Sequence, residues 1–220
     1  MPIPGKYLAD FEEYGIYHVY NRTNNNEKLF LSDKNRYFFL KKYAQFLSCF
    51  LDTYCWCLLP NHFHLLVRVK PVDKIISALE IKEYKELSLT EKKFIDRQVT
   101  TSEMIEQSFK RFFQCYALSF NKENNRKGNL FYKPFKRIEV NKDTQLTQAI
   151  IYIHANPLKH KLVKDFTQYQ WSSWQSILSG SPTQLLRSEI IEWFGSKSLF
   201  IKTHQEMVSF YYEGDLAIEE

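Results

Sequence analysis

The chain has 220 residues, of which 44% are hydrophobic and 16% aromatic, enough to bury a sizeable core. Six glycines and seven prolines are too few for a disordered or low-complexity protein. No apolar run reaches the roughly 18 residues that a membrane span needs, and the first residues lack the pattern of a secretory signal. The four cysteines form no evenly spaced disulfide framework, so we expect a reduced, cytoplasmic protein with no membrane partner.

The formal net charge is only +5, but the charges are unevenly distributed. Residues 121–164 contain ten Lys or Arg and three Asp or Glu, whereas residues 165–220 contain three and eight. A basic segment followed by an acidic one predicts a surface that binds phosphates. A solvated charged face is the alternative interpretation.

Alternating apolar residues and turn formers predict four strands, at residues 15–22, 52–59, 62–69 and 130–140. The second and third strands flank Pro60-Asn61 and form a hairpin. Pro134 favours an edge or bulge position for the fourth strand.

Three helices are predicted between and after these strands. Ser32-Asp33 can cap the first helix, and Thr100 with Glu103 forms a capping box for the second. Asp143 can cap the third helix, which we expect Pro157 to end. Two short helical patterns follow residue 168.

The element order predicts an α+β fold that is ferredoxin-like or RRM-like, with an antiparallel sheet and helices on one face. We expect a main domain over residues 1–168, with residues 71–100 as an insertion. Residues 169–220 would form a C-terminal helical extension.

The motif "LLPNHFHLLV" places His62 and His64 one residue apart in an apolar strand. Because side chains alternate across a strand, both imidazoles should project to one face, while Phe63 projects to the other. Such a pair can bind one divalent ion. Taken alone, the pattern also fits two histidines with a purely structural role.

The third predicted helix offers polar partners for this pair. Its buried stripe consists of Leu146, Ile150 and Ile153, and a neighbouring polar stripe contains Gln145, Gln148, Tyr152 and Asn156. Tyr152 and Asn156 are one turn apart, so the helix could present a phenol and an amide oxygen together. An amphipathic tyrosine and a helix-ending asparagine are the alternative interpretations.

The motif "RKGNLFYKPFKR" interleaves cations with aromatic rings, which is typical of proteins that bind single-stranded nucleic acid. An ordinary edge strand would show a similar pattern. The predicted DNA-binding residues are Arg22, Arg126, Lys127, Phe131, Tyr132, Lys133, Lys136, Arg137, Lys159 and Lys161.

Taken together, "YHVYNR", "CWCLLPNHFHLLV" and "YIHANPLKHKLV" followed by "YQWSSW" resemble the single-tyrosine HUH transposases, in particular the REP-associated tyrosine transposases. The resemblance implies a metal-dependent endonuclease and strand transferase that acts on single-stranded or hairpin DNA, as a monomer or homodimer. It further implies that His62 and His64 bind Mg²⁺ or Mn²⁺ and that Tyr152 forms a 5′-phosphotyrosine. Asn156 stands where insertion-sequence members have a glutamine ligand.

Two alternative functions stay open at this point. Cys55, Cys57, His62 and His64 could form a zinc-binding module, although a C-x-C within a strand is unusual for one. The chain could also be a domesticated nucleic-acid-binding protein that has the fold but no cleavage activity.

Overall fold

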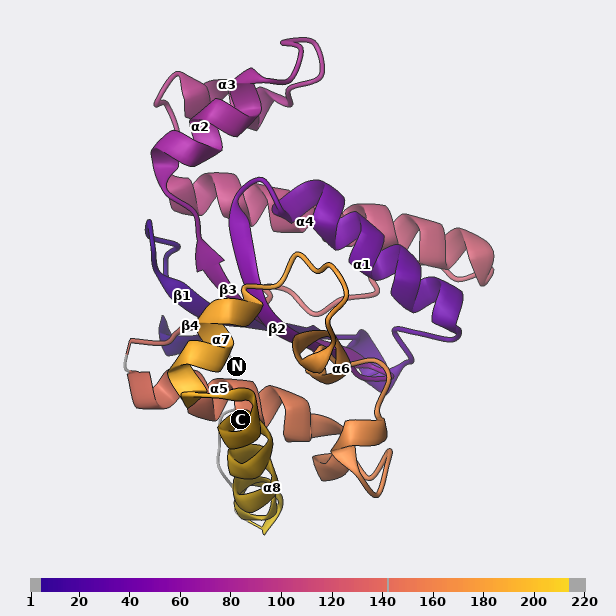
Figure 1. Cartoon of the computed structure of the whole chain (residues 1–220). Helices are drawn as coiled ribbons and strands as arrows, with labels where there is room; N and C mark the ends of the chain where they lie inside the picture. Colours follow the sequence, from indigo (N-terminus) through magenta and orange to yellow (C-terminus); the bar gives the residue numbers. More distant parts are fainter. Residues whose placement is uncertain (1–4, 142, 214–220) are drawn as a thin grey trace.

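Four strands form one antiparallel sheet in the computed structural model, which describes residues 5–141 and 143–213 (Figure 1). The sheet order is β2 (Leu51–Leu58), β3 (His62–Val69), β1 (Ile16–Arg22) and β4 (Lys136–Glu139). All three neighbouring pairs are antiparallel. This order, with a helix after β1 and another after β3, is that of a ferredoxin-like fold, so the predicted α+β class is confirmed.

Helices α1 (Asp33–Leu47) and α4 (Thr101–Glu123) cover the first face of the sheet (Figure 1). Ser32 caps α1, and Thr100 and Glu103 form the predicted capping box of α4. Phe39 and Phe112 pack with Phe63 in this core, which also contains the alternate residues of β1 and β3. Period-two strands and period-3.6 helices thus bury matching apolar faces.

The second face is covered by α5 (Asp143–Lys159), together with α6 (Trp174–Leu178), α7 (Arg187–Phe194) and α8 (Lys197–Glu213) (Figure 1). The expectation of helices on one face only is therefore wrong. The other set of strand positions, such as Cys55, Cys57 and Leu66, is also buried, because this sheet lies between two helical layers.

Two further differences concern helix and strand ends. Helix α5 continues past Pro157 to Lys159, since one missing N–H removes one hydrogen bond and the last turn still forms. Strand β4 is shorter than predicted, because Phe131 and Phe135 enter the first core before the strand begins. The side chain of Asp143, the expected cap of α5, lies outside the described residues.

The shorter elements are η1 (Gly5–Tyr7), η2 (Asn24–Asn26), α2 (Val72–Glu80), α3 (Leu89–Ile95) and η3 (Phe166–Gln168). Helices α2 and α3 fall within residues 71–100 and project from one end of the fold (Figure 1). The domain boundaries stay a prediction. All four cysteines are free, and along the described parts of the chain no helix has the length and apolar character to cross a bilayer.

A buried polar cluster joins α5 to the C-terminal helices. His154 Nδ1 lies 3.0 Å from His204 Nε2, and His154 Nε2 lies 2.9 Å from Ser173 Oγ. Burial lowers the pKa of His204 to about 3, and burial with the nearby His204 holds the pKa of His154 well below its usual value. Both rings are therefore neutral in the folded protein at neutral pH.

We expect stability to fall as the pH drops below about 6.5, because the unfolded chain then binds protons that the folded chain cannot accept. Each such histidine contributes a loss of roughly 1 kcal/mol per pH unit until its folded pKa is reached. In urea unfolding at pH 7 and pH 5, His204→Gln should lose less stability between the two pH values than the wild type. An equal loss in both proteins would contradict the neutral cluster.

Candidate active site

The two motif histidines lie side by side on the sheet face that α5 covers. His64 pairs with Tyr20 of β1 and His62 with Arg22, so these four residues share one face. The ring centroids of His62 and His64 are 5.2 Å apart. The alternation predicted from the sequence is therefore the one that the sheet adopts.

A third histidine, which the sequence analysis did not single out, belongs to the same group. His18 of β1 lies diagonally across from His64, with 2.9 Å between His18 Nε2 and His64 Nδ1. In "YHVYNR", His18 is two residues before Tyr20, so the alternation of the strand puts both side chains on one face. The pairing of β1 with β3 then brings His18 to His64.

Each motif imidazole is held through its Nδ1 atom. His64 Nδ1 contacts His18, and His62 Nδ1 lies 2.6 Å from Asn61 Oδ1. Burial, with the nearby His18, His160 and Lys159, holds the pKa of His64 well below its usual value. A neutral imidazole whose Nδ1 donates a hydrogen bond has its lone pair at Nε2, which is then its metal-binding atom.

Helix α5 and the residue directly after it place three side chains along this group of histidines. The ring centroid of Tyr152 is 5.9 Å from that of His64 and 6.0 Å from that of His18. Two turns later, the ring of His160 lies 4.7 Å from that of His62. Because Asn156 is one turn from each, it lies on the same side of the helix, between two residues that contact the histidines.

The amide of Asn156 is buried, with an exposed fraction of 1%. Its Nδ2 donates to the carbonyl oxygen of Tyr152 at 3.0 Å. Its Oδ1 is a buried acceptor that has no hydrogen-bond partner within the part of the chain that the structure describes. A buried amide oxygen of this kind usually has a partner, and a cation is one that would satisfy it.

The donor set therefore fits a divalent ion. Two imidazoles and one amide oxygen can hold one divalent ion, with the other positions left for water and phosphate oxygens. Over the described residues, no group of three or more His, Cys, Asp or Glu side chains is arranged as a metal site, so the amide oxygen is the third candidate.

The phenol of Tyr152 is close to the histidines but covered. The side chain is 3% exposed, and its hydroxyl is buried. The ammonium group of the exposed Lys159 lies 5.5 Å from the centre of the Tyr152 ring. DNA could reach this hydroxyl only after groups around the end of α5 move.

Several predicted DNA-binding residues lie at one edge of this face. The guanidinium of Arg22 stacks on the half-exposed ring of Tyr132, 4.9 Å from its centroid. Lys136 lies over Tyr7 and Tyr20. The remaining exposed cations of the set are Lys127, Lys133, Lys159 and Lys161.

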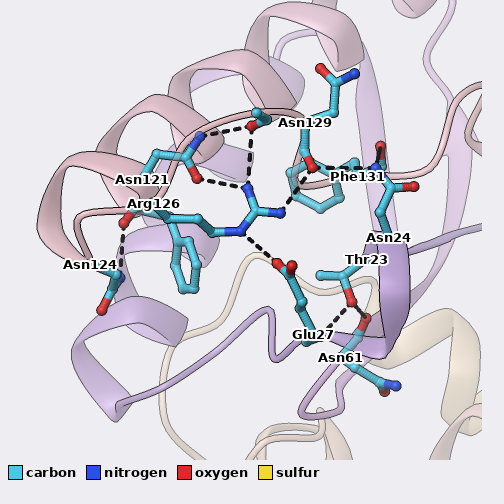
Figure 2. A network of polar contacts seen from close by, with 11 residues as sticks. Thr23, Asn24, Glu27, Asn61, Asn121, Asn124, Arg126, Asn129 and Phe131 are labelled. Carbon is cyan, nitrogen blue, oxygen red and sulfur yellow. Dashed lines mark hydrogen bonds and ion pairs between the residues drawn. The ribbon is translucent and has the colours of Figure 1, made fainter.

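Three members of the predicted set are instead engaged within the protein. Phe131 is buried in the first core. Arg137 pairs with Glu106 and donates to Ala9, on the first face of the sheet. Arg126 pairs with Glu27 at 2.5 Å and donates to the carbonyl oxygens of Gly128 and Asn129, as Figure 2 shows.

The structure does not favour the zinc-binding module. Cys55 and Cys57 are fully buried in the second core, and burial raises the pKa of both thiols. Cysteines bind structural zinc as thiolates, and a raised pKa disfavours the thiolate. Among the described residues, the four proposed ligands do not form a group that could hold a metal ion. His154, two residues from Tyr152, belongs to the C-terminal cluster and is no candidate base for it.

Comparison with known proteins gives distant similarities, and no family model matches the chain. A Haemophilus influenzae protein named "Putative REP-associated tyrosine transposase" is 22% identical over 201 residues, which are 89% of this chain and 97% of that protein. A solved structure, "Structure of the REP associates tyrosine transposase bound to a REP hairpin", is 16% identical. It covers 83% of this chain and 89% of that one, with a TM-score of 0.49.

At that TM-score the fold assignment rests on the strand order and connections of this chain rather than on the superposition. The sequence similarity extends along nearly the whole length of both proteins. The chain is thus a distant relative of the REP-associated tyrosine transposases.

Proposed function

We propose that this protein is a metal-dependent endonuclease and strand transferase, acting on single-stranded hairpin or repeat DNA through a covalent link to Tyr152. One observation carries the proposal: α5 packs the Tyr152 ring against His64 and His18, beside a buried acceptor on Asn156. DNA binding alone needs none of these groups, which is why cleavage is favoured over a domesticated binding protein. The distant relationship to the REP-associated tyrosine transposases supports the same class.

His62, His64 and Asn156 would hold Mg²⁺ or Mn²⁺. When bound, the ion would neutralise charge on the scissile phosphate and stabilise the charge that develops during attack. A free phenol titrates at about pH 10 and is a weak nucleophile at neutral pH, so the reaction needs the stabilisation that the ion would provide.

In the proposed step, Tyr152 Oη forms a bond to phosphorus and the bond from phosphorus to the 3′-oxygen breaks. The phenol loses its proton and the leaving 3′-oxygen gains one. The resulting 5′-phosphotyrosine retains the phosphodiester energy, so a second 3′-hydroxyl can displace Tyr152 and rejoin a strand.

The DNA would cross the edge of the sheet where β1 ends and β4 begins. Arg22 and Tyr132 offer a cation and a stacking ring there, and Lys136 adds positive charge on the same face. Lys127, Lys133, Lys159 and Lys161 would extend this surface along the backbone of the DNA. Because β1, β3 and α5 belong to one chain, a monomer could complete this site, although a homodimer stays possible on sequence grounds.

We expect wild-type protein, incubated with labelled single-stranded hairpins and Mn²⁺, to form a covalent DNA adduct that survives denaturation. Tyr152→Phe should form none, since the nucleophilic oxygen is removed while the ring stays. Tyr132→Phe is the matched control and should retain the adduct. An adduct that persists in Tyr152→Phe would disprove this assignment.

Titration calorimetry with Mn²⁺ tests the ligand set without any DNA. Asn156→Ala should weaken Mn²⁺ binding on the order of tenfold, because a direct ligand of the metal ion is lost. Gln148→Ala removes an exposed amide from the same helix and should leave the affinity unchanged. Equal affinities in both variants would remove Asn156 from the site.

The DNA surface can be tested by the salt dependence of hairpin binding. Arg22→Ala and Lys136→Ala should each reduce the slope of log K against log salt by about 1, because one phosphate contact is lost. Lys74→Ala, on the distant α2, should leave the slope unchanged. Arg126→Ala should lower the free energy of unfolding and leave the slope unchanged, because Arg126 is paired with Glu27 of the same chain.

A further inference from the structure

The turn between β2 and β3 contains a side chain, that of Asn61, which contacts the ring of His62. Asn61 Oδ1 lies 2.6 Å from His62 Nδ1. A carboxamide oxygen only accepts hydrogen bonds, so His62 Nδ1 must carry the proton for this contact to form. The lone pair of the neutral ring is then at Nε2, the atom through which His62 would bind a metal.

Asn61 is itself fixed by its backbone. Its carbonyl oxygen accepts from Thr23 N at 2.9 Å, and the preceding carbonyl of Pro60 accepts from Leu29 N at 2.7 Å. These contacts tie the turn to the segment that follows β1. A substitution of the Asn61 side chain therefore leaves the main-chain support of the turn in place.

The same segment is closed by the Arg126 network. Thr23 Oγ1 donates to the carbonyl oxygen of Glu27, and the Glu27 carboxylate pairs with Arg126 at 2.5 Å (Figure 2). Arg126 in turn holds the carbonyls of Gly128 and Asn129, directly before the aromatic segment at residues 130–135. The loop expected to meet DNA and the turn that carries Asn61 are thus connected by one network of hydrogen bonds and an ion pair.

His64 is held differently. Its Nδ1 contacts His18 Nε2 at 2.9 Å, and either of two neutral rings can donate. That contact fixes the ring orientation of His64 without fixing which ring donates. At His62 the partner is an acceptor only, so the tautomer is determined by chemistry.

We infer that Asn61 is a positioning residue, which selects the Nδ1–H tautomer of His62 and directs its Nε2 toward the site. The effect of this on metal affinity rests on the proposed function, whereas the tautomer does not. Metal-ligating histidines depend on such partners, whose removal typically costs about 10–100-fold in affinity.

Ring ¹⁵N NMR of the metal-free protein tests the tautomer directly. The His62 signals, assigned with His62→Gln, should show a protonated Nδ1 and an unprotonated Nε2 in the wild type. Asn61→Leu, which has the same size but no acceptor, should lose this preference, and Asn61→Asp should retain it. An Nδ1–H tautomer that persists unchanged in Asn61→Leu would overturn the inference.

Mn²⁺ calorimetry on the same proteins gives the second readout. Asn61→Leu should bind Mn²⁺ about 10–100-fold more weakly than the wild type, and Asn61→Asp should bind it at least as tightly. Asn129→Leu should bind Mn²⁺ with the affinity of the wild type, because Asn129 contributes to the network through its main-chain carbonyl. Equal weakening in all three variants would show a general structural effect and overturn the inference. Failure of the proposed function is read separately, as wild-type protein that binds no Mn²⁺ or forms no adduct.

Discussion

The packing of α5 across the second face of the sheet is the constraint on which the candidate site depends. Strands β1 and β3 present three histidines on that face, but alone they offer only imidazoles. Helix α5 adds a phenol and an amide one turn apart, and His160, directly after the helix, adds another imidazole, so their spacing matches that of the side chains on the strands. A rotation of α5 about its axis would separate all of these contacts together.

The C-terminal helices stabilise this packing, because they contact the side of α5 that faces away from the sheet. From residue 150 to residue 157 every side chain of α5 is buried, since the sheet lies on one side and α8 on the other. His154 contacts His204 and Ser173 on the outer side, while Tyr152 meets His18 and His64 on the inner side. The C-terminal extension therefore helps to set the angular position of Tyr152.

The same packing explains why the phenol is buried. A helix held tightly enough to fix the ring against His64 also excludes solvent from its hydroxyl. In the proposed reaction, the packing that positions the Tyr152 ring therefore also hinders access of DNA to its hydroxyl. The exposed Lys159 lies over the ring and marks the side from which a phosphate would approach. The covering groups near the end of α5 would move, while the sheet keeps the imidazoles in place.

Charge and aromatic patterns were a less reliable guide than periodicity. The basic segment at residues 121–164 predicts a phosphate-binding surface, and the residues named from it divide into two groups. Arg126 and Arg137 are internal ion-pair partners and Phe131 is a core residue, whereas Tyr132 and Lys136 lie near the site. A guanidinium pairs as readily with a nearby carboxylate as with a phosphate, so the pattern alone did not distinguish the two.

Local patterns in the sequence predict the presence of the four strands, the caps of α1 and α4, the shared face of His62 and His64, and the one-turn spacing of Tyr152 and Asn156. Packing between segments distant in the sequence is what places helices on both faces, His18 against His64 and His160 against His62. These contacts join segments whose pairing depends on the sheet order and on burial of the whole chain. No repeat within one strand or helix encodes them.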